Sequence, residues 1–520
     1  MKNKIIFLDA ISIQKKGIEY FLNSKDWPVS ENLFWKLTNF IYQEYINELK
    51  TLDKKSYKIA LIDIKFLGLL INILHYNYVK NFLIKNNYEY FFDKSASKFL
   101  YPNWEEISKA YEKFDYPYNK LMRLLRKLIK LIYFNRHLKL INIIKGILCE
   151  KKNLSFGSFD KIKEDYIKTT NNFYLHIEWI DIIKKCNFDK KNLKSFKIKI
   201  LSKILKKISK SSSLNPFIQG LNLKVINATA NARLQSISLI YDYLLTLKTP
   251  KELILTESAN SFHKIISSAY LYKGSKVVNF SHGNDIGLVH QKWTQTYFYA
   301  QSGNYAFENN KICKIINKAA KKLPLKKIEK TNFISVASDI GLKRENITYK
   351  KIRKNKIKKI MVMGFPMNTT RYTDDVYCFF HYAIKLQIQL LINLKYLGYY
   401  TIYKAHPDRL LEVGNLMNKF ADECNNNKFE NVWDTADALV FTITTSTTFG
   451  FAITTPLPIV LINAITTDWN YSRKLQIKKR IHILDYKYSN GKHIGINSEK
   501  LNYSLEKAKN KIPINLIKGL

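Results

Sequence analysis

The spacing of apolar residues changes along this chain near residue 250. Before that point, apolar positions recur mainly at helical spacing, and only residues 5–8 and 59–64 form the short apolar runs that predict strands. After it, short apolar runs alternate with helical patterns, as in proteins that pack helices on parallel sheets. The sequence therefore predicts an α/β protein with a helix-rich region over residues 1–245.

The alternating part consists of two blocks. The first, residues 250–345, contains a predicted helix over 261–272 and predicted strands over 253–255, 276–280 and 333–337. The second contains a predicted helix over 375–397 and predicted strands over 360–363, 399–403, 438–443 and 459–462.

The basic, polar stretch between the two blocks predicts the domain boundaries. Residues 346–359 are expected to form a linker between a first domain over residues 1–345 and a second domain over residues 360–480. Residues 481–520 are expected to form a helical extension of the second domain.

Two segments of the helix-rich region, residues 120–152 and 194–210, mix Leu and Ile at helical spacing with Lys and Arg. This pattern is typical of a helix that lies on an anionic membrane surface. It is equally consistent with a helix whose apolar stripe packs on its own domain while its lysines face water. The pattern does not choose between these two interpretations.

Charge favours anionic partners. Lys and Arg together number 85 against 42 Asp and Glu, for a formal net charge of +43, which attracts phospholipid, nucleic acid or an anionic substrate. No zinc-finger, RRM or KH signature accompanies the charge, so no nucleic-acid partner is expected. The five cysteines have no CxxC spacing, which indicates a reducing compartment and no structural metal. We expect a cytoplasmic protein that associates peripherally with a membrane, because the N-terminus lacks the features of a signal peptide.

The most informative stretch lies in the second block. The predicted strand over residues 399–403 leads into Lys404, His406 and Pro407, and the strand over 438–443 runs into the hydroxyl residues Thr444, Thr445, Ser446, Thr447 and Thr448. A hydroxyl-rich turn after a parallel strand places N–H and O–H groups at the carboxyl edge of the sheet, where α/β proteins bind phosphates. Capping of the next helix is the simpler use of any one hydroxyl, but five exceed what a cap needs. Gly364, after the first strand of this block, would let the backbone approach a nucleotide closely.

Polar residues also follow two predicted strands of the first block. His282 and Asp285 come after the strand over residues 276–280, and Glu257 comes after the strand over residues 253–255. Either carboxylate could act as a base or as a nucleophile. These residues could equally have a structural role: Glu257 and Asp285 could cap a helix, and His282 could lie in a tight turn.

In this order, the His-Gly motif at His282, the Lys-x-His-Pro motif from Lys404 to Pro407 and the hydroxyl turn before Pro-Leu-Pro resemble bacterial GT-B glycosyltransferases of capsule and lipopolysaccharide synthesis. The likeness is greatest to the transferases that use CMP-activated Kdo or sialic acid, and it covers residues 250–465. It implies two Rossmann-like, doubly wound domains that face a cleft. It also implies metal-independent transfer without a cofactor, from a CMP-sugar donor to a glycan or glycolipid acceptor at the inner membrane.

The resemblance also implies roles for individual residues. Lys404, His406, Pro407 and the hydroxyl turn would hold the nucleotide and its phosphate, while the polar residues of the first block would serve the transfer chemistry. This chain departs from the family pattern after the turn, where it runs Phe449-Gly450-Phe451-Ala452-Ile453 without the acidic residue common there. The departure puts a ribose-binding carboxylate in doubt.

Two other functions fit parts of the sequence. The same skeleton occurs in the CDP-glycerol and CDP-ribitol phosphotransferases, in which His282 would be the base and the product a phosphodiester. A non-catalytic protein could instead use its charge to bind a membrane or nucleic acid. Such a protein would not need hydroxyl turns at strand ends.

Overall fold

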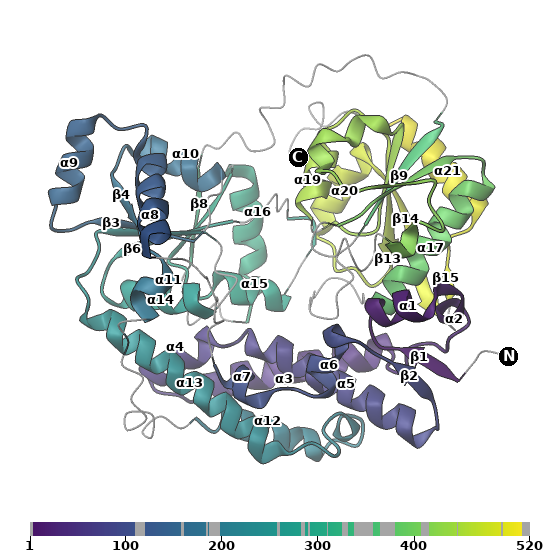
Figure 1. Ribbon diagram of the computed structural model, residues 1–520, viewed down its shortest axis with the longest axis horizontal. Coiled ribbons are helices and arrows are strands. Elements are labelled where there is room, and N and C mark those ends of the chain that lie inside the picture. The colour runs from purple at the N-terminus through teal and green to yellow at the C-terminus, as the bar shows by residue number, and fades with distance from the viewer. Residues whose placement is uncertain are drawn as a thin grey trace.

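A computed structural model shows a mixed α/β protein in which a helical base carries two lobes, each built on its own sheet (Figure 1). The residues that the structure describes are 4–109, 120–157, 161–183, 186, 198–256, 261–281, 287–289, 292–308, 310–324, 331–336, 357–364, 380–406, 415–444, 446–489 and 492–511.

The helical base is formed by two parts of the chain, residues 4–109 and 198–246. Its core consists mostly of aliphatic and aromatic side chains. Helix α5 (Phe66–Lys85) contributes many of them, because it is buried along most of its length. The elements of the base are β1 (Ile5–Phe7), α1 (Ala10–Lys16), α2 (Ile18–Leu22), α3 (Glu31–Leu49), α4 (Lys54–Ile62), α5 (Phe66–Lys85), β2 (Glu89–Phe91), α6 (Lys94–Leu100), α7 (Trp104–Ser108), α12 (Ile200–Ser209), a 3₁₀ turn (Asn215–Phe217) and α13 (Leu223–Thr246).

No helix in the described part of the chain is by itself long and apolar enough to cross a membrane. Helices α4 and α5 reach that length and composition only when taken as a pair, and the pair is bent by 56°.

The first lobe contains a six-stranded sheet in the order β4-β3-β5-β6-β7-β8, with every neighbouring pair parallel. The chain runs outward to one side from β3 to β4 and to the other side from β5 to β8, so the order reverses between β3 and β5. The elements are α8 (Lys120–Asn135), α9 (Leu140–Leu148), β3 (Asn153–Phe156), α10 (Lys161–Thr170), β4 (Tyr174–His176), α11 (Trp179–Ile183), β5 (Glu252–Thr256), α14 (Ser261–Tyr272), β6 (Lys276–Phe280), α15 (Lys292–Tyr299), β7 (Asn304–Phe307), α16 (Asn310–Ala320) and β8 (Asn332–Ser335).

The second lobe contains a seven-stranded sheet in the order β11-β10-β9-β12-β13-β14-β15. Its first six strands are parallel, and their order of appearance in the chain is 3-2-1-4-5-6, the order of a doubly wound nucleotide-binding sheet. The elements are β9 (Lys359–Met363), α17 (Phe380–Tyr396), β10 (Tyr400–Lys404), α18 (Asn415–Met417), β11 (Glu423–Asn425), 3₁₀ turns (Phe429–Asn431 and Trp433–Thr435), β12 (Ala438–Phe441), α19 (Thr447–Ala452), β13 (Ile459–Ala464), α20 (Tyr471–Arg480), β14 (His482–Ser489), β15 (Lys492–Ile494) and α21 (Ser498–Lys509).

Two sequence predictions about secondary structure are wrong. Residues 59–64 do not form a strand but belong largely to α4, whose start is fixed by Asp53, the side chain of which accepts hydrogen bonds from the N–H groups of Lys55 and Ser56. Apolar runs of this length fit a buried helix as well as a strand. Residues 481–520 are not simply a helical extension, because β14 and β15 complete the sheet before α21 begins.

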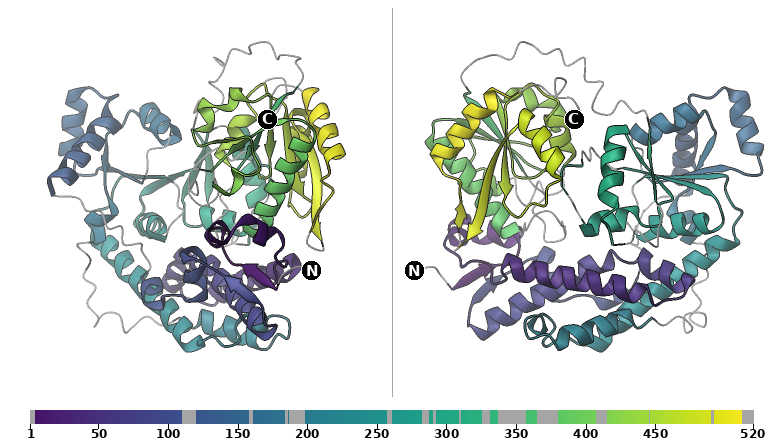
Figure 2. Two further views of the ribbon diagram at one scale, coloured as in Figure 1. Left: turned by 45° about the vertical axis from the view of Figure 1, so that its right-hand side comes forward. Right: turned by 180° about the vertical axis from the view of Figure 1, so that it is seen from behind.

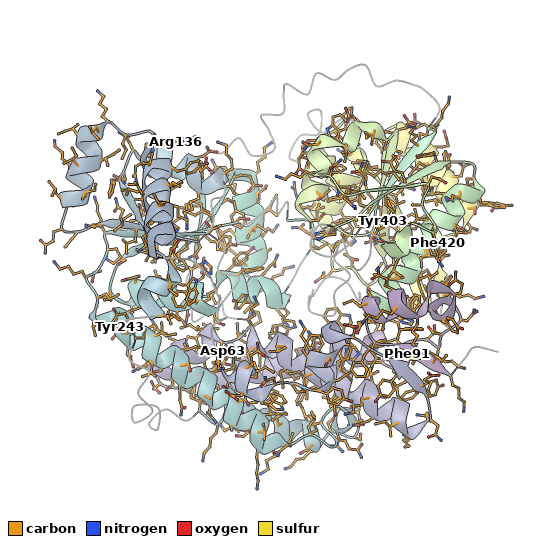
Figure 3. The ribbon with its side chains drawn as sticks, viewed as in Figure 1. Asp63, Phe91, Arg136, Tyr243, Tyr403 and Phe420 are labelled. Carbon is orange, nitrogen blue, oxygen red and sulfur yellow. The ribbon has the colours of Figure 1, made fainter. Side chains whose placement is uncertain are left out.

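A buried ion pair joins the two parts of the chain that form the base. Arg233 of α13 donates from Nε and Nη2 to the two carboxylate oxygens of Asp63, at 2.9 and 2.7 Å, and from Nη1 to the carbonyl oxygen of Ile107 at 2.7 Å. Both charges are shielded from water, so the pairing is needed to keep them there. Figure 3 places Asp63 under the first lobe and Tyr403 inside the second.

The base also supports the second lobe directly. The Trp27 ring packs against Phe380 and His381 of α17, with ring centroids 5.7 and 5.9 Å apart, and its indole N–H donates to Nε2 of buried His75 at 2.9 Å. Tyr488 of β14 donates to the Asp26 carboxylate at 3.1 Å. The N-terminal residues therefore form part of the foundation of the C-terminal lobe.

A short segment connects the two lobes. Residues 287–289, which precede α15 of the first lobe, lie with Leu288 and Val289 buried in an apolar cluster of the second lobe. Val289 forms an antiparallel bridge with Trp469, and the N–H of Asn470 donates to the carbonyl oxygen of Leu288 at 2.8 Å. We call residues 287–289 the interlobe strap.

Candidate functional site

The central residue of the candidate site is Lys404, the last residue of β10. Its side chain is buried and its ammonium donates to the carbonyl oxygen of Ala405 at 2.8 Å. Burial lowers the pKa of Lys404 below its ordinary value, and the carboxylate of Glu430 acts in the opposite direction. A phosphate beside this ammonium would favour its charged form, because an anion offsets the loss of hydration. His406 follows at the sheet edge and is half-buried.

Gly364 lies beside Lys404 at the end of the neighbouring strand β9. Its N–H donates to the carbonyl oxygen of Lys404 at 2.8 Å. A Cβ atom at this position would lie 2.6 Å from that oxygen and 2.9 Å from the hydroxyl of Tyr403. The structure thus gives a packing reason for glycine here, and the predicted approach to a nucleotide stays a prediction.

One glutamine of α17 ties together the ends of the three central strands. Gln387 donates from Nε2 to the carbonyl oxygen of Met363 at 3.2 Å and to the hydroxyl of Thr442 at 3.5 Å, and its Oε1 accepts from Tyr403 at 2.8 Å. Tyr403, Met363 and Thr442 belong to or directly follow β10, β9 and β12. This buried network fixes the relative positions of the strand ends, and the sequence pattern did not reveal it.

The hydroxyl turn follows β12 at the same edge. Ser446 caps α19, its hydroxyl accepting from the N–H of Phe449 at 3.0 Å, so for this residue the capping interpretation holds. Thr444 and Thr448 are half-buried. Thr447 begins α19, and Thr445 lies outside the described residues.

These residues meet at one place because the three strands are adjacent and parallel. Lys404 is in register with Met363 of β9, and Val362 of β9 with Val440 of β12. The chain order reverses between β9 and β12, and doubly wound sheets bind their ligands at such a switch point, outside the carboxyl ends of the strands. Gly364 and the hydroxyl turn follow the two strands that border this point.

Several predicted site residues cannot be placed. Pro407, Glu257, His282 and Asp285 lie outside the described residues. The strands that precede the last three are described: Thr256 of β5 is in register with Phe280 of β6. The predicted roles of all four residues stay predictions.

The first lobe has a cationic group at its own switch point that sequence analysis missed. Lys163 of α10 is fully buried and donates to the carbonyl oxygen of Phe156, the last residue of β3, at 2.8 Å. His263 of α14 lies nearby, since a Cβ atom on Gly157 would come within 3.0 Å of its Nε2. Burial, together with the charges of neighbouring lysines, first among them Lys163, lowers the pKa of His263 to about 3.

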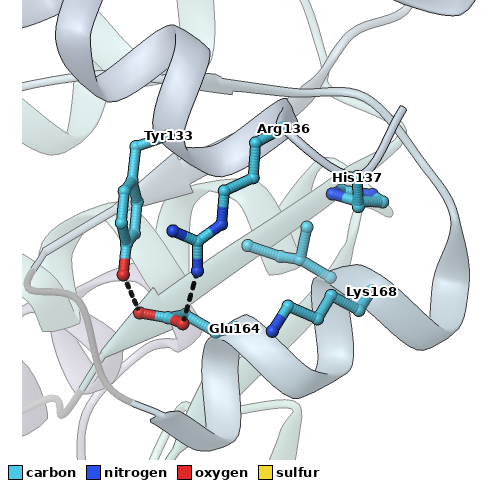
Figure 4. Close-up of a pocket in the computed structure, with 6 residues that line it drawn as sticks. Tyr133, Arg136, His137, Glu164 and Lys168 are labelled. Carbon is cyan, nitrogen blue, oxygen red and sulfur yellow. Dashed lines mark hydrogen bonds and ion pairs between the residues drawn. The ribbon is translucent and has the colours of Figure 1, made fainter. Parts of the chain in front are cut away.

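A small pocket lies elsewhere, on the side of the first lobe between α8 and α10 (Figure 4). There the hydroxyl of Tyr133 donates to the Glu164 carboxylate at 2.5 Å, and Arg136 pairs with the same carboxylate at 3.6 Å. Tyr133 and Arg136 both bind the Glu164 carboxylate, and we assign the pocket no ligand. Within the described part of the chain, no group of three or more His, Cys, Asp or Glu residues is placed to hold a metal ion.

Comparisons with known proteins give a distant structural neighbour and no relative by sequence. No protein-family model matches the chain, and no curated protein matches it. A glycosyltransferase from Rickettsia africae ESF-5 is a structural neighbour with 12% sequence identity and a TM-score of 0.31, over 71% of this chain and 96% of the other. A TM-score this low carries no argument about fold or activity.

Proposed function

We propose that the protein is a GT-B-type glycosyltransferase whose second lobe binds a nucleotide-activated sugar. The observation that carries this proposal is the second sheet, whose strand order of 3-2-1-4-5-6 reverses beside Gly364, Lys404 and the hydroxyl turn. Nucleotides bind at this point of doubly wound sheets. Following the sequence motifs, the donor is a CMP-activated acidic sugar such as Kdo or a sialic-acid-like sugar.

Each part of this edge has a chemical use in such a reaction. The Lys404 ammonium, with His406, offsets negative charge on the leaving phosphate, and the hydroxyls of Thr444 and Thr448 donate to phosphate oxygens. The Gln387 network holds these groups in place before the donor arrives. No metal ion is required by this arrangement of donors.

The first lobe then binds the acceptor, a glycan or glycolipid. Its loop after β6 contains His282 and Asp285, and this loop begins at Ser281 in the first lobe and leads to the interlobe strap in the second. In this proposal His282 or Asp285 supplies the base that glycosyl transfer requires. Glu257, after the adjacent strand β5, is the alternative carboxylate.

Nucleotide binding by the purified protein tests this proposal. Thermal unfolding is measured with CMP, CDP, UDP, GDP and ADP, because a bound ligand raises the melting temperature by an amount that grows with its affinity and concentration. We expect CMP to stabilise the wild type most. A preference for CDP would favour a polyol phosphotransferase, and no response to any nucleotide would overturn the proposal.

A pair of lysine variants locates the site. Lys404→Met keeps the length of the side chain and removes its charge, so it is expected to fold and to lose most of the stabilisation by CMP. Lys500→Met, at an exposed position on α21 of the same lobe, is the matched control and should keep it. Equal stabilisation of the two variants by CMP would place the nucleotide elsewhere.

A further inference from the structure

Helix α9 of the first lobe is apolar and yet has no buried residue. Its sequence is LINIIKGIL, and Leu140 and Leu148 at its two ends are 72% and 78% exposed. Ile141, Ile144 and Ile147 are exposed as well. A helix of this composition is ordinarily covered by its own domain, because exposed Leu and Ile forgo the free energy of burial.

Helix α8 beside it presents a second apolar face to water. Leu125, Leu128, Ile129 and Ile132 are exposed, and their spacing of three, four and seven residues places them on one side of the helix. Because only residues 136–139 separate the two helices along the chain, we consider the exposed apolar residues of α8 and α9 together and call them the α8–α9 surface. It lies at the edge of the first lobe farthest from the second (Figures 1 and 2).

Polar contacts hold α8 in this orientation. Asn135 donates to the carbonyl oxygen of Tyr174 and accepts from its N–H, both at 2.9 Å. Lys130 pairs with Glu178 at 2.8 Å, and Tyr133 donates to Glu164. Polar groups of α8 therefore bind the lobe while its aliphatic face points outward, the reverse of an ordinary surface helix.

The position of α9 is equally specific. A Cβ atom on Gly146 would lie 2.2 Å from the ring of Phe173, so only glycine allows the helix to lie this close to the lobe. The outward direction of its aliphatic side chains is set by this contact.

Helix α12, the other basic amphipathic segment, behaves differently. Its apolar residues Ile200, Leu201, Ile204, Leu205 and Ile208 are all buried in the base, and its lysines face water or pair with α3. For this segment the structure favours packing on its own domain. Of the two basic amphipathic segments, as far as the structure describes them, the one that contains α8 and α9 leaves its apolar residues uncovered.

The positive charge around the α8–α9 surface indicates what kind of partner covers it. Residues 120–149 contain eight Lys or Arg and no Asp or Glu. Lys139 and Lys145 are exposed on and beside α9, next to the aliphatic side chains. A second copy of this surface would bring like charges together, whereas an anionic lipid surface has the opposite charge and an apolar interior.

We propose that the α8–α9 surface docks the protein onto an anionic phospholipid bilayer, with its Leu and Ile side chains in the headgroup–acyl boundary and Lys139 and Lys145 among the phosphates. The docking is peripheral, because α9 is about 14 Å long and lies along the surface of the lobe. The proposal does not depend on the proposed function, since docking requires neither donor nor acceptor.

The proposed docking is tested by measuring how much of the protein binds to vesicles that are then sedimented. We expect binding to phosphatidylcholine vesicles that contain phosphatidylglycerol, weaker binding to phosphatidylcholine alone, and release by salt. Replacing Ile129, Ile132, Leu140 and Leu148 together by Gln should reduce partitioning by about tenfold or more. Lys139→Gln with Lys145→Gln should reduce it by about thirtyfold on anionic vesicles only.

Two control variants keep the test specific. Ile392→Gln with Tyr396→Gln removes exposed apolar side chains from α17, and Lys206→Gln with Lys210→Gln removes exposed charges from α12. Both should bind vesicles like the wild type, as should Lys404→Met. The proposal is overturned if wild type does not bind anionic vesicles, if the controls lose as much binding, or if the Gln variant only converts a dimer into a monomer in sedimentation velocity.

Discussion

The main-chain N–H of Asn470 donates to the carbonyl oxygen of Leu288 at 2.8 Å, across the boundary between the lobes. Leu288 comes from the first lobe's connection between β6 and α15, and Asn470 precedes α20 of the second lobe. The loop that contains His282 and Asp285 is thereby tied at its far end to the nucleotide-binding half of the molecule that we propose.

Asn470→Pro tests the interlobe hydrogen bond. Asn470 has a φ of −69°, which proline adopts without strain, so the main effect is loss of the N–H donor. We expect the free energy of unfolding in urea to fall by about 1–2 kcal/mol, and amide exchange of residues 287–289 to accelerate. Asn470→Ala keeps the N–H and loses only the contact with Ser472, so it should change stability little. Equal effects of the two variants would contradict a role for this bond.

Tyr403→Phe tests the network that joins the strand ends. Removing the hydroxyl leaves Oε1 of buried Gln387 without its donor, at an expected cost of about 1–3 kcal/mol in the free energy of unfolding. Tyr399→Phe is the matched control, because its hydroxyl bonds to Asn502 at an exposed position and should cost less than about 1 kcal/mol. Denaturant titration of both variants checks the difference, and similar losses would mean that the network does not stabilise the sheet edge.

Gly364→Ala tests the close approach of β9 and β10. The added methyl group would meet the Lys404 carbonyl oxygen at 2.6 Å, and this oxygen belongs to a central strand that cannot move cheaply. We expect a loss of about 1–3 kcal/mol, measured as a lower urea midpoint, together with weaker stabilisation by CMP. An alanine variant as stable as the wild type would show that the strand ends lie farther apart.

Buried histidines make stability depend on pH. Burial lowers the pKa of His75 to about 3, and burial together with Lys385 lowers that of His493 to about 4 against an opposing hydrogen bond to the Tyr382 carbonyl. In the unfolded chain an imidazole takes up its proton near pH 6.5, so below that pH the unfolded state binds more protons and stability falls. Each histidine should cost about 2 kcal/mol between pH 7 and pH 5.

Urea midpoints at pH 7, 6 and 5 measure this loss. His75→Gln can still accept from the Trp27 indole and does not titrate, so its stability should fall less steeply than that of the wild type. If the urea midpoints of the wild type and of His75→Gln fell equally with pH, His75 would be protonated in the folded state.

Sequence patterns located the clearly apolar strands well and several short strands poorly. The predicted helix over residues 261–272 and the strand over 276–280 match α14 and β6, because both combine clear periodicity with a turn between them. Strands β3, β4, β7 and β11 were missed because three or four residues are too few to show a period. Strand β14, with its polar HILDYKYS, has no apolar run to detect.

The candidate site was predictable only where it coincides with strand ends. Lys404 and the hydroxyl turn were found because each follows an apolar run, and the sheet topology does bring them to one edge. Gln387 and Lys163 were not found, since each lies within a helix and acquires its partners only when helix and sheet pack together. Contacts between distant segments leave no local pattern in a sequence.

The support that Trp27 gives to the second lobe bears on how the protein can be divided. A fragment that starts at β9 would contain the whole second sheet, but it would expose the faces of Phe380 and His381 that Trp27 covers, and Tyr488 would lose its bond to Asp26. The second lobe is therefore not a detachable module, and the packing around Trp27 is complete only after α17 has been synthesised.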